Sequence, residues 1–178
     1  MDSLATCRTI QSTHKNRSSN SAGRSGDPTH LSIYLCLDLS WTLVRVSEEI
    51  RDTFSKARVI AMATASRHGV PNVIYVGMWW WEDNSTLCVV NNYLRKTMKN
   101  NEANPNVCFV ALHREEGRSI SYQVKCRAEN QNKGPLYDKA RRIAEERGRH
   151  FPARSVIACR VREVYQAFSG ERAGNRIA

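Results

Sequence analysis

The chain has 178 residues and an apolar fraction of 41%, enough for one hydrophobic core, so we expect a single domain preceded by a tail. It carries 27 basic and 17 acidic residues, a formal net charge of +10, which favours an anionic partner. No run of 18 apolar residues occurs, which excludes a membrane-spanning helix, and no signal-like apolar stretch lies near the start, so we expect a cytoplasmic protein.

The first part of the chain differs in composition from the rest. Residues 8–30 are rich in Ser, Thr, Asn, Arg and Gly and have no periodicity, a composition that cannot offset the entropy of ordering. We therefore expect residues 1–43 to be a disordered tail. Our hypothesis is that this tail comes from an over-extended gene start, with translation beginning near Leu43 or Val44. The domain then spans residues 44–178.

A short amphipathic helix and two β-hairpins are predicted at the start of this domain. The helix follows Ser47, a good N-cap residue that precedes two glutamates. The apolar runs 58–65 and 72–81 are separated by a turn containing Gly69, and a second turn leads to the run 86–91. Connections this short require antiparallel pairing, because parallel strands need a longer crossover.

The remaining elements follow in the same alternating order. They are a polar helix over 92–104, strands over 106–113 and 119–129, a helix opened by Pro135 and a strand over 155–165. Six strands with short helices predict a mainly β fold, a closed or nearly closed antiparallel barrel without exposed edges. The order excludes a Rossmann fold, which needs alternating βαβ units.

The cysteines and histidines show neither a disulfide nor a metal pattern. Four cysteines lie inside apolar or alternating stretches without any C-x-x-C pair: Cys88, Cys108, Cys126 and Cys159. They predict buried, reduced thiols in a reducing compartment. His68, His113 and His150 are scattered over predicted turns and element ends, so no metal site is predicted.

The most informative segment follows the third predicted strand and opens a helix. Arg95 can form two hydrogen bonds with phosphate oxygens, Lys96 adds a charge and Thr97 a hydroxyl donor. The free N–H groups and the dipole of the same helix start also favour an anion. These residues suit a phosphate monoester, although taken alone they are explained better by a solvated basic helix start, because such clusters are common.

An ordered set of motifs resembles a known family. The motifs are A-T-A-S-R-H-G-V-P-N at 63–72, Y-L-R-K-T-M-K-N-N-E-A-N-P at 93–105, S-Y-Q-V-K-C-R-A-E at 121–129 and G-P-L-Y at 134–137. They resemble those of the pyridoxamine 5′-phosphate oxidase-like family of FMN-binding split barrels, especially its small prokaryotic members. The resemblance covers about residues 44–178.

This resemblance implies a six-stranded antiparallel split β-barrel of Greek-key-like order, with short helices, that forms a homodimer with FMN at the subunit interface. The implied cofactor-binding residues are Tyr75, Val76 and Gly77 along the isoalloxazine edge, Asn91 and Asn92 beside the ribityl chain, Arg95, Lys96 and Thr97 on the phosphate, and Gln123 on the fifth strand. Asn100 is expected to orient the helix rather than to touch the ligand.

The implied function is that of a flavin-dependent oxidoreductase acting on a small substrate. The second strand lacks the arginine that the full oxidases carry, so oxidation of pyridoxamine phosphate itself is not expected. A non-catalytic FMN carrier and the use of a deazaflavin in the same fold remain as alternatives.

The three tryptophans Trp79, Trp80 and Trp81 allow two readings. They either pack in the core or interface, which large aromatics usually do, or stack on flavin or substrate. Together with the charge they also suggest a barrel that binds single-stranded nucleic acid. Basic residues do not alternate with these tryptophans, so this reading ranks below the flavin one.

Overall fold

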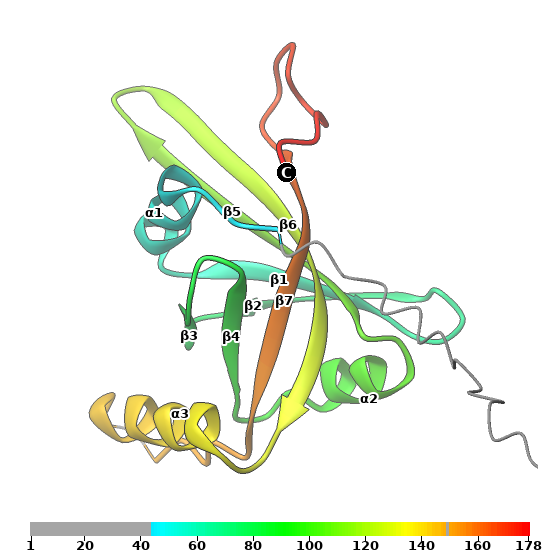
Figure 1. The fold of residues 1–178 in the computed structure, drawn as a ribbon, viewed down its shortest axis with the longest axis vertical. Coiled ribbons are helices and arrows are strands. Elements are labelled where there is room, and N and C mark those ends of the chain that lie inside the picture. The colour runs from blue at the N-terminus through cyan, green and yellow to red at the C-terminus, as the bar shows by residue number, and fades with distance from the viewer. Residues whose placement is uncertain (1–43, 149) are drawn as a thin grey trace, which may run out of the picture. The chain divides into compact units, whose positions relative to one another are not determined.

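The computed structural model of the protein describes residues 44–148 and 150–178, so the predictions for residues 1–43 lie outside the described residues. Within these ranges the chain forms three helices and seven strands (Figure 1). The helices are α1 Glu48–Ala57, α2 Arg95–Ala103 and α3 Pro135–Glu146. The strands are β1 Ile60–Ala65, β2 Pro71–Val76, β3 Trp79–Trp81, β4 Thr86–Asn91, β5 Asn106–Glu115, β6 Arg118–Gln131 and β7 Ser155–Gln166.

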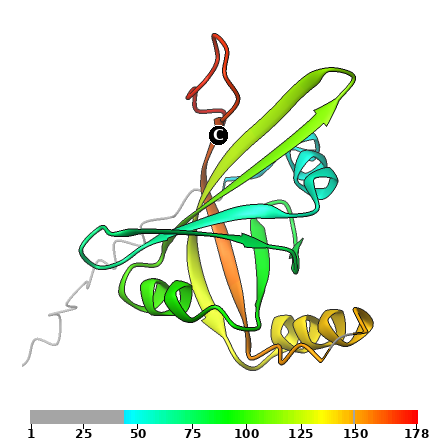
Figure 2. The same ribbon diagram turned by 180° about the vertical axis from the view of Figure 1, so that it is seen from behind.

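The strands form one antiparallel sheet in the order β2-β1-β5-β6-β7-β4-β3. Three pairs of sequence neighbours, β1–β2, β3–β4 and β5–β6, form hairpins, and β7 joins β6 to β4. The sheet curls into a half-barrel, and β2 and β3 occupy its two ends (Figures 1 and 2). The prediction of a mainly β, antiparallel fold is confirmed. The predicted closure without exposed edges is wrong, because in the described part of the chain β2 and β3 do not pair and remain as the two edges of the sheet.

The predicted number of six strands is wrong, because the run 72–81 is not one strand. The chain leaves the sheet at Gly77 and Met78, between β2 and β3. β2 pairs with β1 and β3 pairs with β4, so five strands separate the two halves of the run in the sheet order. A single straight strand cannot lie at both ends of the sheet, and the break at Gly77 is the physical consequence.

One face of the sheet carries the main hydrophobic core. Side chains alternate across the strands, so Met62 of β1, Phe109 of β5 and Val124 of β6 all point to this face and are fully buried. The helix α1 covers the same face with Ile50 and Phe54. This packing fixes α1 against the sheet and defines one wall of the groove considered below.

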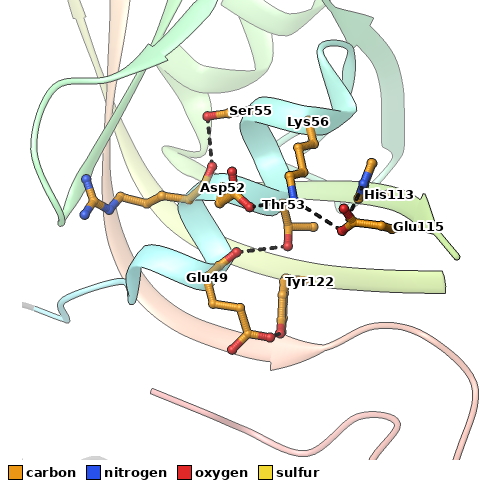
Figure 3. Close-up of polar contacts among 9 residues, drawn as sticks. Glu49, Asp52, Thr53, Ser55, Lys56, His113, Glu115 and Tyr122 are labelled. Atoms are coloured by element: carbon orange, nitrogen blue, oxygen red, sulfur yellow. Dashed lines mark hydrogen bonds and ion pairs between the residues drawn. The ribbon is translucent and has the colours of Figure 1, made fainter. Parts of the chain in front are cut away.

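The helix α1 begins where the sequence predicts and is tied to the β5–β6 hairpin. The hydroxyl of Ser47 accepts a hydrogen bond from a first-turn backbone N–H at 3.5 Å. Figure 3 shows two links to the hairpin: the Tyr122 hydroxyl donates to Glu49 across 2.7 Å, and the Lys56 ammonium lies 3.2 Å from Glu115. These links hold one side of the helix.

The helices α2 and α3 lie at the end of the sheet away from the tip of the β5–β6 hairpin (Figures 1 and 2). A second, smaller core forms where α3 packs Ala140 and Ala144 against Val90 of β4 and Val156 of β7. The alanines allow a close approach of the helix, which brings the end of α3 toward the cavity described in the next section.

All four cysteines of the described residues are free thiols. Cys88, Cys126 and Cys159 are buried, as predicted, whereas Cys108 is only half-buried. Burial raises the pKa of every one of these thiols, that of Cys88 to about 12. Among the residues that the structure describes, no helix is both long and apolar enough to cross a membrane.

Candidate functional site

The candidate site is a cavity of about 550 Å³ where β2 ends and α2 approaches. Its lining residues are Tyr75, Val76, Gly77, Met78, Val90, Asn92, Tyr93, Leu94, Arg147 and Phe151. The volume lies within the range of small-molecule sites, about 300–1,000 Å³. Four residues that the sequence predicted, Tyr75, Val76, Gly77 and Asn92, meet here.

The free edge of β2 forms one wall of the cavity. β2 is the last strand of the sheet and pairs only with β1, so the backbone groups on its other edge have no strand partner. Val76 points into the core and is 5% exposed, whereas Tyr75 is 79% exposed. The buried side chain holds the strand in place while its edge offers backbone donors and acceptors to a flat ligand.

Asn91 and Asn92 shape the turn between β4 and α2. The Asn91 amide oxygen accepts from the Leu94 N–H at 3.1 Å, and its amide nitrogen donates to Ser155 at 3.0 Å. Asn92 accepts from the Ala153 N–H at 3.1 Å. Both side chains therefore fix the backbone of the turn, and Asn92 also lines the cavity. Their predicted place beside a ribityl chain stays a prediction.

The start of α2 is strongly basic. Arg95 and Lys96 are both exposed, and the first turn of the helix contains no acidic residue. Among the described residues, neither side chain forms an ion pair with a carboxylate. Leu94, the N-cap residue, provides no side-chain cap. Two cations and the positive end of the helix dipole thus reinforce each other directly after Leu94, which lines the cavity. Arg95 and Lys96 are not themselves lining residues, and their predicted contact with a phosphate stays a prediction.

Thr97, the third predicted phosphate ligand, points into the protein. It is 1% exposed, and its hydroxyl accepts from the Asn72 amide nitrogen at 3.3 Å. The same Asn72 nitrogen and that of Asn100 both donate to Thr64 of β1, at 3.3 and 3.1 Å. This cluster anchors α2 to the sheet, and the Asn100 bond to Thr64 is what a helix-orienting residue would form. The role of Thr97 as a phosphate ligand stays a prediction.

Gln123 lies apart from the cavity. The strand register places Gln123, Val110, Ala61 and Tyr75 in one row across β6, β5, β1 and β2. Three strand spacings separate Gln123 from Tyr75, roughly 14 Å. Gln123 is half-buried on the outer face of the sheet and does not line the cavity of its own chain. Its predicted contact with the cofactor stays a prediction.

Six lining residues were not predicted from the sequence: Met78, Val90, Tyr93, Leu94, Arg147 and Phe151. Arg147 follows α3 and reaches the cavity only because of the tertiary packing of that helix. The guanidinium of Arg154 lies 5.8 Å from the Tyr93 ring, a cation–π contact. Phe151 is the one of these residues that the sequence could have indicated. It is a lone aromatic residue in a polar stretch, as expected of a residue that lines a cavity.

The structure thus combines a curled antiparallel sheet, a cavity at a free strand edge and a basic helix start next to it, in a small, mainly β protein. The sequence profile of the family described as pyridoxamine 5′-phosphate oxidase matches residues 46–168. The chain belongs to this family.

Two individual proteins are similar to this chain over most of its length. The uncharacterized protein MJ0282 of Methanocaldococcus jannaschii is 27% identical over 139 residues, which cover 77% of this chain and 91% of the relative. Among solved structures, HupZ of Group A Streptococcus has a TM-score of 0.62 at 24% identity, covering 72% of this chain and 99% of HupZ.

Two further structures share the fold at lower identity. An FMN-binding protein from Syntrophomonas wolfei has a TM-score of 0.56 at 14% identity, covering 69% of this chain and 91% of its own. A structure described as F420 reductase has a TM-score of 0.52 at 16% identity, and the match covers 67% of this chain and 98% of the reductase chain. At these identities the likeness concerns the fold alone.

Proposed function

We propose that the protein binds FMN in the cavity beside β2 and acts as a flavin-dependent oxidoreductase on a small substrate. The observation that carries this proposal is the position of the cavity between a free strand edge and the basic start of α2. FMN combines a flat ring that has an amide-like edge with a phosphate monoester at the far end of a flexible chain. Bound FMN would supply the redox chemistry, and the protein would position it.

The phosphate end is assigned to Arg95 and Lys96. Both side chains are exposed and carry no carboxylate partner among the described residues, so their charges are available to a ligand. Charge-assisted hydrogen bonds from such groups are about twice as strong as neutral ones. Thr97 supports them by fixing the first turn of α2 through its contact with Asn72.

The ring end is assigned to the edge of β2 from Tyr75 to Gly77. The backbone groups there have no strand partner, and Met78 and Phe151 add apolar walls to the cavity. Asn92 holds the turn next to the ribityl chain through its contact with Ala153. The residues present therefore fit a flavin in both the donor set and the volume of the cavity.

A homodimer is the second part of the proposal. The outer face of the sheet exposes three large apolar side chains: Val73 at 64%, Tyr75 at 79% and Leu112 at 48%. Gln123 and Val110 lie on the same face. Contiguous apolar surface of this kind marks an interface. A second copy covering this face would enclose the ring and bring its own Gln123 to the cofactor.

Replacing Val73 with Lys tests the dimer. We expect the variant to sediment as a monomer and to lose FMN, because it places a charge on the face that the second copy would cover. Val70→Lys is the matched control, since Val70 is 63% exposed but lies in the turn between β1 and β2. A wild-type protein that is monomeric at all concentrations would contradict the dimer.

The visible spectrum of the purified protein tests the cofactor. We expect flavin absorption bands and, after denaturation, release of a compound with the mass of FMN. A deazaflavin would show a different band position and mass. A colourless protein that also fails to take up added FMN would rule out the proposal.

Turnover separates the oxidoreductase from an FMN carrier. We expect reduction of the bound flavin by NADPH or NADH and reoxidation by an added acceptor. Reduction by dithionite alone, with no turnover by any biological donor, would favour the carrier. Salt-dependent binding of labelled single-stranded DNA at sub-micromolar protein would instead favour the nucleic-acid function.

We also infer that the protein works in the cytoplasm. Cys88, Cys126 and Cys159 are free and buried, which suits a reducing compartment.

A further inference from the structure

A second pocket lies between α1 and β3, next to the proposed flavin cavity. This groove has a volume of about 710 Å³. Its walls include Arg51 and Asp52 from α1, Arg58 from the end of that helix, and the three tryptophans of β3. The groove shares Gly77 and Arg147 with the flavin cavity, so the two spaces adjoin. A molecule in the groove would lie next to a ligand in the cavity.

The charges around the groove favour a single negative charge. Arg51, Arg58 and Arg147 line it, against the two carboxylates of Glu48 and Asp52. The Asp52 carboxylate is 3.0 Å from the Lys56 ammonium, but both side chains are exposed, so Asp52 keeps its charge (Figure 3). The groove therefore has an excess of positive charge, but Glu48 and Asp52 remain close enough to disfavour a dianion.

Two buried donors in the groove walls have no acceptor. Among the described residues, the Nε–H of Arg51 and the indole N–H of Trp81 are buried and form no hydrogen bond. A buried donor without a partner costs about 1–3 kcal/mol. The indole N–H groups of Trp79 and Trp80, in contrast, are bonded to the Arg58 carbonyl and to Glu82. Neither atom is exposed to solvent, so an oxygen-rich ligand that displaces wall side chains would supply the acceptors that Arg51 and Trp81 lack.

Arg58 is held in a strained backbone conformation at the mouth of this groove. Its φ is 58° and its ψ is −46°, and the Val59 N–H donates to the Ala57 carbonyl across 2.6 Å, so Arg58 is the central residue of a tight γ-turn. A glycine would adopt this conformation at lower cost. Strain of this kind at a residue with a long charged side chain is typical of binding sites.

We propose that the groove binds the carboxylate of a small aromatic acid, which would be the substrate or co-substrate of the flavin. The carboxylate oxygens would accept from Arg51, Arg58 and the Trp81 indole, and the aromatic body would lie against the tryptophan side chains. The substrate role rests on the proposed FMN site. Carboxylate is preferred over phosphate because Glu48 and Asp52 border the groove.

The test is calorimetric titration of the full-length protein, with and without saturating FMN. The probes are benzoate, its neutral analogue benzyl alcohol, and phenyl phosphate. We expect saturable binding of benzoate, weaker binding of phenyl phosphate and none of benzyl alcohol. Benzyl alcohol binding as well as benzoate, or phenyl phosphate binding more tightly than benzoate, would overturn the assignment.

Two variants locate the binding site. Arg58→Gly removes the charge and relieves the backbone strain, so it does not threaten folding, and Trp81→Phe keeps an aromatic ring but removes the indole donor. Each should weaken benzoate binding about tenfold while leaving FMN affinity unchanged. Arg114→Gln is the control, because Arg114 is exposed on β5 and lines neither pocket. Equal affinity for benzoate in wild type and Arg58→Gly would overturn the proposal.

The two proposals fail in different ways. Binding of FMN without binding of benzoate would overturn the groove assignment and leave the flavin site intact. Binding of benzoate without binding of FMN would overturn the proposed function, while supporting the groove as a carboxylate site.

Discussion

The indole N–H of Trp79 donates to the backbone carbonyl of Arg58 across 3.0 Å. This bond joins the end of α1 to β3 and holds Arg58 at its positive φ of 58°. Trp79 and Trp81 also pack edge-on against Phe54 of α1, with ring centroids 6.1 and 5.6 Å apart from it. The expected packing of these tryptophans against the core is confirmed for Trp79 and Trp81, and both also line the groove. Stacking on flavin or substrate stays a prediction.

Arg58→Gly should stabilise the fold. Glycine adopts the γ-turn conformation without a Cβ penalty, so we expect the free energy of unfolding to rise by about 0.5–1 kcal/mol. Urea denaturation followed by circular dichroism measures it. The control is Arg67→Gly in the β1–β2 turn, where φ is not positive and glycine should lower stability. A loss of stability in Arg58→Gly would show that the conformation carries no strain.

Lys96→Ala should weaken FMN but not riboflavin. Removal of one charged phosphate contact should cost about 1.5–3 kcal/mol of FMN binding energy. Riboflavin has no phosphate, so its affinity should stay within experimental error, as measured by quenching of flavin fluorescence. Lys99→Ala, an exposed lysine in the same helix, is the control. Equal losses for both ligands would remove Lys96 from the phosphate site.

Thr64→Val should destabilise the protein more than Thr97→Val. The Thr64 hydroxyl accepts from both Asn72 and Asn100, whereas Thr97 accepts only from Asn72. We expect losses of about 2–3 and about 1 kcal/mol, because Thr64→Val leaves the buried Asn100 amide without an acceptor, whereas Asn72 keeps one acceptor in either variant. Urea midpoints compare the two variants. The reverse order would mean that the cluster is organised by Thr97.

Raising the pH above 10 should weaken the fold through Tyr122. Burial, together with the hydrogen bond to Glu49, raises the pKa of Tyr122 to about 12. The folded state then holds the phenol proton more tightly than the unfolded chain. Its contribution is therefore fully present below pH 10 and is lost between about pH 10 and 12. Absorbance at 295 nm reports the ionisation, and Tyr122→Phe should show a shallower loss of stability over this interval.

Alkylation should distinguish Cys108 from the other three thiols of the described residues. Burial raises the pKa of all four, but only Cys108 is half-exposed. Because the thiolate is the reactive species and needs access, iodoacetamide at pH 8 should modify Cys108 first. Peptide mapping by mass spectrometry gives the order. Modification of Cys159 before Cys108 in the native protein would contradict the burial of the Cys159 side chain.

Local signals in the sequence predicted much of the fold correctly. Ser47 caps α1, and the run 86–91 matches β4 at both ends. These features depend on side-chain period, capping chemistry and short turns, all of which act over a few residues. The break at Gly77 does not, because the run from Asn72 to Trp81 is favourable for a strand on both sides of this glycine, and a single glycine also occurs in bulges of continuous strands. Only the partners of its two halves, at opposite ends of the sheet, require the chain to leave the sheet there.

The candidate site was predictable in part for the same reason. The basic start of α2 and the end of β2 are each one short continuous segment, so both could be selected from the sequence. The orientation of Thr97 depends on Asn72, 25 positions away, and the presence of Arg147 depends on how α3 packs. Such contacts between distant segments follow from the tertiary structure and leave no periodic pattern in the chain.

The two-residue link between β2 and β3 couples the two margins of the sheet mechanically. Edge strands normally fray and exchange their amide hydrogens independently of each other. Here any displacement of β2 is transmitted through Gly77 and Met78 to β3, although five strands lie between them. Deuterium uptake by the amides of β2 and β3 should therefore rise and fall together. A ligand bound in one pocket should slow the uptake in both strands.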